Sequence, residues 1–238
     1  MPDALKLFET RVLTEWLPSF CHAPNRAYST DGFRIKSIHS LEPYDAEWFM
    51  RAIDHDLVTH SDGAFRAPLS TVSEQIFWQG LKSVAPRPVT LWHEPVITIG
   101  ALARLHIEYG WPISVLGMQS KRKWAFDLVG YGGDGLRELL LCEVKKSDAE
   151  IAKLRAWMLQ YCAIDPLEQE PAEAGACNAY RKVQDIRIAW PERVWLLGPG
   201  GRGELFRIDR IDGTVRFDLA SEPNTLLSHK EFLSISSR

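Results

Sequence analysis

The sequence contains few cysteines and no long apolar run, and both absences narrow what the protein can be. Only four cysteines occur in 238 residues, and they are too scattered for the paired spacing of zinc sites or for a disulfide framework. The longest apolar runs fall far short of the roughly 20 residues that cross a bilayer. No basic segment followed by an apolar one opens the chain. We therefore expect a cytoplasmic protein with reduced thiols and no membrane contact.

Several catalytic signatures are missing as well. The seven histidines show no His-Glu-x-x-His or other paired-ligand spacing. No serine or cysteine lies in a nucleophile elbow, and the glycine-rich segment 198–201 lacks the lysine and hydroxyl residue of a phosphate-binding loop. The formal net charge of −3 argues mildly against nonspecific coating of nucleic acid, although it leaves room for a local basic groove.

The most informative feature is an aspartate, Asp127, and a triplet, Glu143, Val144 and Lys145. They lie on two apolar runs, 124–131 and 139–146, which flank a glycine-rich link and so predict a β-hairpin. If the turn centres near Gly135, Asp127 lies opposite Glu143, with Cβ atoms roughly 5 Å apart. Glu143 and Lys145 are two residues apart and so share one face of their strand. The pattern predicts two carboxylates and one ammonium group at one point.

The context of the triplet carries more weight than the triplet itself, because an acid two residues before a lysine is expected about once by chance in a chain of this composition. The apolar run 139–142 places the charges at the end of a buried strand, where unpaired charges are costly. The chain then reaches Ser147 and Asp148, which are suitable helix caps, and a helical pattern follows over 149–162. Carboxylate oxygens with a few waters are the ligands that Mg²⁺ prefers.

This order of elements resembles the PD-(D/E)XK nuclease superfamily, also called restriction-endonuclease-like. Its pattern is an acid on one core strand, (D/E)-x-K on the next, then a helix and a further strand, and the resemblance covers roughly residues 70–200. It implies an Mg²⁺- or Mn²⁺-dependent nuclease in which Asp127 and Glu143 hold the metal and Lys145 orients the attacking water or stabilises the phosphate. The Val144 carbonyl is a further expected ligand. Phe126 stands where the name-giving motif has proline.

The same resemblance implies an upstream acid on the helix before the core strands. Glu74 is the best candidate, because it lies in the first turn of the helix that the sequence predicts over 71–84. Glu108 competes with it from a short helix expected over 101–109, and Glu94 is a weaker third. A glutamate in a first helical turn is also explained by the helix dipole alone.

We expect an α/β fold with a mixed central sheet flanked by helices, a restriction-endonuclease-like core and additions at both ends. The expected division is an N-terminal extension (1–69), the nuclease-like core (70–200) and a C-terminal hairpin appendage (201–238), packed as one compact unit. The patterns predict helices over 4–17, 44–57, 71–84, 149–162 and 178–189. They predict strands over 33–38, 89–99, 113–118, 193–198, 204–209 and 214–219, with loops over 18–31 and 165–175.

The predicted function is hydrolysis of nucleic-acid phosphodiesters, with DNA preferred over RNA as the substrate. A homodimer or a partner subunit is a further expectation, since cutting both strands of a duplex favours two sites. The alternatives are an inactive nuclease-fold subunit that binds nucleic acid or a partner protein, and an unrelated α/β interaction protein. Cations expected to contact phosphates are Lys121, Arg122, Lys123, Lys153, Arg155, Arg181 and Lys182. Trp111 and Trp124 are candidates for base stacking.

Overall fold

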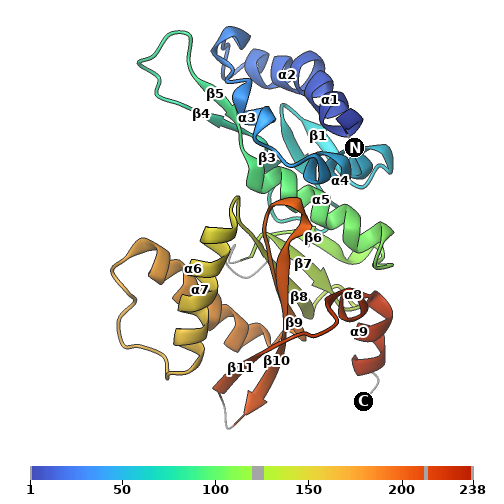
Figure 1. Cartoon of the computed structure of the whole chain (residues 1–238), viewed down its shortest axis with the longest axis vertical. Helices are drawn as coiled ribbons and strands as arrows, with labels where there is room; N and C mark the ends of the chain where they lie inside the picture. Colours follow the sequence, from blue (N-terminus) through green and yellow to red (C-terminus); the bar gives the residue numbers. More distant parts are fainter. Residues whose placement is uncertain (1, 120–125, 212–213, 237–238) are drawn as a thin grey trace.

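The computed structural model describes residues 2–119, 126–211 and 214–236. Over these residues the chain forms a six-stranded mixed sheet in the order β11-β10-β9-β8-β7-β6, with two small sheets beside it. Figure 1 shows α6 and α7 on one side of the large sheet and α8 and α9 on the other. The expected mixed α/β architecture, with a central sheet flanked by helices, is therefore confirmed.

The central sheet is antiparallel except at its middle, where β8 and β9 run parallel. Every residue of β8 is buried, which explains its continuous apolar run, because helices cover both faces of such a strand. A parallel pair needs a long crossover, and α6 and α7 provide it. The strands are β6 (Leu116–Met118), β7 (Leu128–Tyr131), β8 (Glu138–Val144), β9 (Arg193–Leu197), β10 (Gly203–Ile211) and β11 (Thr214–Leu219).

Helices pack against the sheet through apolar contacts. α5 (His93–Ile107) packs on β6, β7 and β8, whereas α6 (Asp148–Cys162) packs on α7 (Ala174–Ala189) and β9. The C-terminal helices α8 (Pro223–Leu227) and α9 (His229–Ser236) surround Trp111. The indole of Trp111 is fully buried and donates to the Leu227 carbonyl at 2.8 Å. Trp111 is thus a core residue, and its predicted base-stacking role is wrong.

The N-terminal segment lies above the large sheet in the view of Figure 1, and its buried apolar residues belong to the same core cluster as those of the sheet. The ring of Phe49 lies 5.3 Å from those of Phe8 and Trp16 and 5.0 Å from that of Phe65, centroid to centroid. These edge-to-face contacts join helices to the small sheets. The helices are α1 (Pro2–Arg11), a π-helical stretch (Val12–Trp16), α2 (Leu17–His22), α3 (Lys36–His39) and α4 (Pro43–Asp54). The strands are β1 (Thr59–Ser61), β2 (Ala64–Arg66), β3 (Glu74–Gln75), β4 (Phe77–Gln79) and β5 (Val89–Leu91).

Several sequence predictions are confirmed. The hairpin forms as β7 and β8, and α6 begins after Ser147, whose hydroxyl accepts from the Glu150 N–H. Strand β9 and the β10–β11 hairpin also form where expected, although the turn residues 212–213 lie outside the described residues. α4 covers most of the helix predicted over 44–57.

The helix predicted over 71–84 is wrong: this segment holds β3, β4 and the beginning of a loop. Its apolar residues do not share one helical face, because Ile76 and Phe77 are buried while Trp78 and Leu81 are exposed. Backbone pairing of β3 with β2 and of β4 with β5 replaces the hydrogen bonds that a helix would have made. Tertiary pairing here overrides a weak local preference. Glu74 therefore lies on a strand.

The strand predicted over 89–99 is also wrong beyond Leu91, because α5 begins at His93. Pro95 lies in the first helical turn, where its missing N–H costs nothing. Almost all of α5 is buried, so its sequence lacks the polar face that reveals a helix. The short helix expected over 101–109 is the second half of α5.

Three smaller boundaries differ as well. The strand expected over 33–38 is α3 preceded by a single bridge from Phe33 to Val89. The loop expected from residue 18 begins only after His22, where α2 ends. α7 begins at Ala174, so Asn178 lies inside the helix and does not cap it.

The division at 69/70 and 200/201 stays a prediction. β3 pairs with β2 across the first boundary, and β10 pairs with β9 across the second. Within the described ranges no helix combines the length and apolar character that a bilayer crossing requires. The cytoplasmic location stays a prediction.

Candidate active site

Asp127 and Glu143 meet at one end of the central sheet. Leu128 of β7 pairs with Cys142 of β8, and the Asp127 N–H donates to the Cys142 carbonyl at 3.0 Å. The Asp127 carboxylate in turn accepts from the Val144 N–H, with 2.8 Å between N and Oδ2. These two bonds place the Asp127 carboxyl group beside the end of β8, at the level of Glu143, which is the register that the hairpin predicts.

Glu143 is held between two ammonium groups. Its Oε1 accepts from Lys145 Nζ at 2.6 Å, and its Oε2 accepts from Lys182 Nζ at 2.5 Å. Glu143 and the Lys182 side chain are only 2% and 5% exposed, whereas the Lys145 side chain is 20% exposed. Lys145 Nζ also contacts the Val144 carbonyl at 3.0 Å. We call Asp127, Glu143, Lys145 and Lys182 the acid–lysine cluster.

The two carboxyl groups of the cluster have opposite pKa shifts. Burial, reinforced by the Glu143 charge, raises the pKa of Asp127 to about 8. Burial acts in the same direction on Glu143, but Lys182 and Lys145 outweigh it and hold the pKa of Glu143 below its usual value. The carboxylates of Glu143 and Asp127 raise the pKa of Lys145 against the effect of burial. At neutral pH the cluster thus holds an ionised Glu143, two ammonium groups and a largely protonated Asp127.

Lys182 was expected only as a surface contact for phosphates, and this expectation is wrong. It projects from α7 into the interior, where its Nζ lies 4.8 Å from the centre of the Phe126 ring. Its neighbours on the helix, Ala179, Val183 and Ile186, are fully buried. A lysine at a core position of an amphipathic stripe was the signal in the sequence that could have identified it.

Two further acids, Glu94 and Glu74, lie near the cluster. Glu94, in the first turn of α5, has its Oε1 4.0 Å from Lys145 Nζ. Glu74 accepts from the Gln119 side chain at 3.1 Å, and the Gln119 N–H donates to the Asp127 carbonyl at 2.9 Å. Burial raises the pKa of Glu74, and the Glu94 charge adds to this. Gln119 has φ near +60°, a costly conformation for a residue with a side chain and one that is common at functional sites.

Glu108 does not join this group. It pairs with Arg104 at 3.1 Å at the far end of α5, about 20 Å along the helix from Glu94 at 1.5 Å per residue. Among the residues that the structure describes, no group of three or more histidine, cysteine, aspartate or glutamate side chains has the arrangement of a metal site. The metal ligation expected of Asp127, Glu143, Val144 and Glu74 therefore stays a prediction.

A groove of adjoining cavities reaches the exposed side of the cluster. Lys145 and Glu94 line a cavity of about 340 Å³ that also borders α6 and α7. Glu94 also borders a second cavity of about 470 Å³, which reaches His93 and Lys146. Glu143 and Asp127 do not line these cavities and lie behind Lys145. The groove is the route by which a ligand would approach the cluster.

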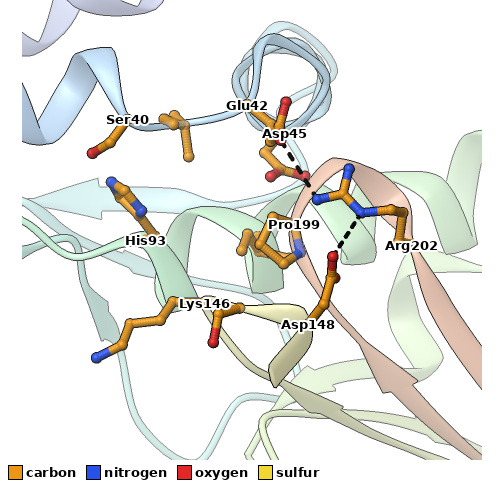
Figure 2. Close-up of a pocket in the computed structure, with 11 residues that line it drawn as sticks. Ser40, Glu42, Asp45, His93, Lys146, Asp148, Pro199 and Arg202 are labelled. Carbon is orange, nitrogen blue, oxygen red and sulfur yellow. Dashed lines mark hydrogen bonds and ion pairs between the residues drawn. The ribbon is translucent and has the colours of Figure 1, made fainter. Parts of the chain in front are cut away.

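A third cavity, of about 250 Å³, continues the groove past His93 and Lys146. Figure 2 shows Arg202 at its far wall, bridging toward Glu42 and Asp148, while the Lys146 side chain extends away from them. The distances are 3.5 Å from Arg202 Nη2 to Glu42 and 3.2 Å from Nε to Asp148. The acidic partners neutralise Arg202, so this end of the groove offers little attraction to an anion.

Three other cations expected to contact phosphates are paired with acids. Lys153 lies 3.3 Å from Glu173, Arg181 binds both oxygens of Glu170, and Arg155 pairs with Glu204. Lys121, Arg122, Lys123 and Trp124 lie outside the described residues.

Comparison of the chain with protein-family models, with curated proteins and with solved structures returned no match in any of the three. A functional assignment therefore depends on the residues and geometry of this chain.

Proposed function

We propose that the protein is a divalent-metal-dependent nuclease that hydrolyses nucleic-acid phosphodiester bonds, with DNA as the preferred substrate. The observation that carries the proposal is the meeting of Asp127, Glu143 and Lys145 at the ends of β7 and β8. The order of elements also supports it, since the acid-bearing β7 precedes β8 with its Glu-x-Lys, and α6 and β9 follow. This is the order that the PD-(D/E)XK resemblance implies, and it favours a restriction-endonuclease-like core.

The charges of the site fit a divalent cation. Four carboxyl groups lie in or beside the acid–lysine cluster, on Asp127, Glu143, Glu94 and Glu74. Two ammonium groups, those of Lys145 and Lys182, balance part of their charge. When every group is ionised, two negative charges remain, the number that one divalent ion neutralises. Burial and, after it, the Glu143 charge raise the pKa of Asp127, and a cation beside the carboxyl group would favour its ionised form. Mg²⁺ keeps several waters and is often held by one or two protein carboxylates, so Asp127 and Glu143, with the Val144 carbonyl, suffice as ligands.

The two lysines have different roles in this proposal. Lys182 is enclosed and holds one Glu143 oxygen, so it positions the carboxylate. Lys145 borders the groove and, with its raised pKa, remains an ammonium group that stabilises the charge developing on the phosphate. A bound divalent ion supplies charge neutralisation and a lowered pKa of its water.

Thermal unfolding tests the metal site. Saturating Mg²⁺ or Mn²⁺ should raise the melting temperature of the parent protein by about 5–10 °C, since ligand at 100 times its Kd adds about 2.7 kcal/mol and each kcal/mol shifts Tm by about 2–4 °C at this size. Glu143→Gln should abolish the rise. Glu173→Gln is the matched control, because Glu173 borders the cavity that Lys145 lines and its side chain is 63% exposed. An unchanged parent Tm would count against the site.

Cleavage tests the activity. Linear, circular and single-stranded DNA are incubated with Mn²⁺ and the parent protein, Asp127→Asn or Lys145→Gln. We expect cleavage by the parent and its loss in both variants. Cleavage that persists in both variants would assign the activity elsewhere.

One observation favours a second candidate, an inactive nuclease-fold subunit that binds nucleic acid or a partner protein. Both oxygens of Glu143 already bind ammonium groups, so a cation has to displace one of them. DNA binding without cleavage, and without a metal-dependent change in Tm, would identify this candidate.

A further inference from the structure

An exposed pair of tryptophans lies on the β4–β5 ribbon beside the groove. Trp78 of β4 is 60% exposed, and Trp92, directly after β5, is 36% exposed. Their ring centroids are 5.7 Å apart with an interplanar angle of 76°. Trp78 pairs with Thr90, so Trp92 is its diagonal neighbour on the same face of the ribbon. The two indoles therefore form one aromatic surface.

Core packing does not account for this surface. On the opposite face of the ribbon, Phe77, Val89 and Leu91 are 2%, 0% and 5% exposed, and they supply the apolar contacts that anchor it. Single exposed apolar residues are ordinary. Two adjoining indoles that border a cavity are the arrangement of a ligand site, because an indole offers a large flat face at little cost in conformational entropy.

The indole pair faces the groove that leads to the acid–lysine cluster. Trp78, Trp92 and Lys146 line the cavity of about 470 Å³. Glu94 borders this cavity and also the one that Lys145 lines. A chain that crosses Lys145 and continues along the groove therefore passes over the indoles. The Lys146 side chain in the same cavity is 58% exposed and pairs with Glu150 at 3.6 Å.

We propose that Trp78 and Trp92 form a stacking platform for unpaired bases, so that the substrate is single-stranded DNA or DNA with an unpaired segment next to the bond that is cut. The proposal rests on the nuclease function above and specifies its substrate class. A base inside a duplex has both faces covered by its neighbours, whereas an unpaired base presents a free face to an aromatic ring. The steep angle between the indoles lets each ring take a different base.

Binding is measured without metal, so that it is independent of cleavage. The probes are a fluorescein-labelled oligothymidylate of about 20 nucleotides and a blunt duplex of the same length, titrated in EDTA at one fixed salt concentration. The variants are Trp78→Ala, Trp92→Ala and Trp78→Phe. Leu81→Ala is the matched control, because Leu81 lies in the loop after β4 and is 73% exposed without bordering the cavity. Trp78 is largely exposed, so its replacement leaves the fold intact, and Tm of each variant checks this.

We expect the single strand to bind more tightly than the duplex. Each Trp→Ala change should weaken single-strand binding about tenfold, equivalent to ~1.4 kcal/mol, while Trp78→Phe and Leu81→Ala remain within about threefold of the parent. Tighter duplex binding, no binding, or unchanged affinity in both Trp→Ala variants would overturn the platform. Incubation of the same probe with Mn²⁺ separates the two proposals. If the probe is cleaved but its affinity is the same in the parent and in both Trp→Ala variants, only the platform proposal fails. If binding depends on the indoles but no cleavage occurs, the platform is supported and the nuclease proposal fails.

Discussion

Replacement of Lys182 by methionine tests whether the acid–lysine cluster is built around a buried ion pair. Lys182 Nζ lies 2.5 Å from Glu143 Oε2, and both side chains are at most 5% exposed. Methionine has a similar length and can pack on the ring of Phe126, so the change removes the charge and little volume. It leaves the Glu143 carboxylate buried with Lys145 as its remaining amine.

The expected cost is large. Removing one partner of a buried ion pair costs roughly 3–5 kcal/mol when the remaining charge is left unpaired. Glu143 keeps Lys145 at 2.6 Å, so the expected cost lies near the lower end of this range. This is a substantial fraction of the about 5–15 kcal/mol that stabilises an ordinary domain. The double variant Lys182→Met with Glu143→Gln should cost less than the sum of the two single changes, by about 2 kcal/mol, because the interaction between the two side chains is lost only once.

Urea unfolding at pH 7 in EDTA, followed by tryptophan fluorescence, measures these free energies. Lys153→Met is the control, because Lys153 pairs with Glu173 at 3.3 Å but both side chains are 63% exposed. Such a surface pair contributes less than about 1 kcal/mol. If Lys182→Met is no more destabilising than Lys153→Met, or if the double variant is additive, the buried pair does not exist as described.

Three other substitutions test local features of the fold. Asp45 is buried, and burial raises its pKa from 3.8 to about 6, so the ionised carboxylate destabilises the folded protein at higher pH. Asp45→Asn should therefore increase the free energy of unfolding by up to about 3 kcal/mol at pH 8. In urea titrations this gain should disappear as the pH falls from 6 to 4. Gly130→Ala would place a Cβ 2.7 Å from the ring of Trp111 and should cost about 1–3 kcal/mol by urea unfolding, whereas Gly133→Ala, with open space around its Cβ, should change little. Ser147→Ala removes the N-cap hydroxyl of α6 and should lower stability by ~1 kcal/mol in the same assay, with Ser147→Gly costing only a few tenths; equal costs for alanine and glycine would contradict the capping role.

The comparison of sequence with structure is clearest at the two ends of α5. Sequence patterns favoured Glu74 and Glu108 as upstream acids, because each appeared to lie on a helix. Glu74 lies on a strand, Glu108 pairs with Arg104, and Glu94 is the acid that approaches Lys145. The error began with the segment before α5, which forms β3 and β4. Periodicity alone does not separate a strand from a helix in such short apolar runs.

Sequence patterns also could not predict contacts between side chains that meet only when distant segments pack together. Lys182 is separated from Glu143 by 39 residues, and Trp78 and Trp92 adjoin because β4 pairs with β5. A pattern in a short stretch of sequence does not reveal a contact between residues so far apart in the chain. A lysine on an apolar stripe was a usable signal, but its partner could not be named without the position of α7 against β8.

The sequence alone determined the β7–β8 hairpin, the register that brings Asp127 to Glu143, the cap and extent of α6, and the β10–β11 hairpin. These depend on alternation, turn residues and capping side chains, which act between neighbours along the chain. The tertiary structure decided that Glu143 lies between two amines, that Glu94 approaches Lys145, and that two indoles border the groove. Those contacts join segments distant in sequence, and they follow from how the buried apolar faces of α5, α7 and the β4–β5 ribbon pack together.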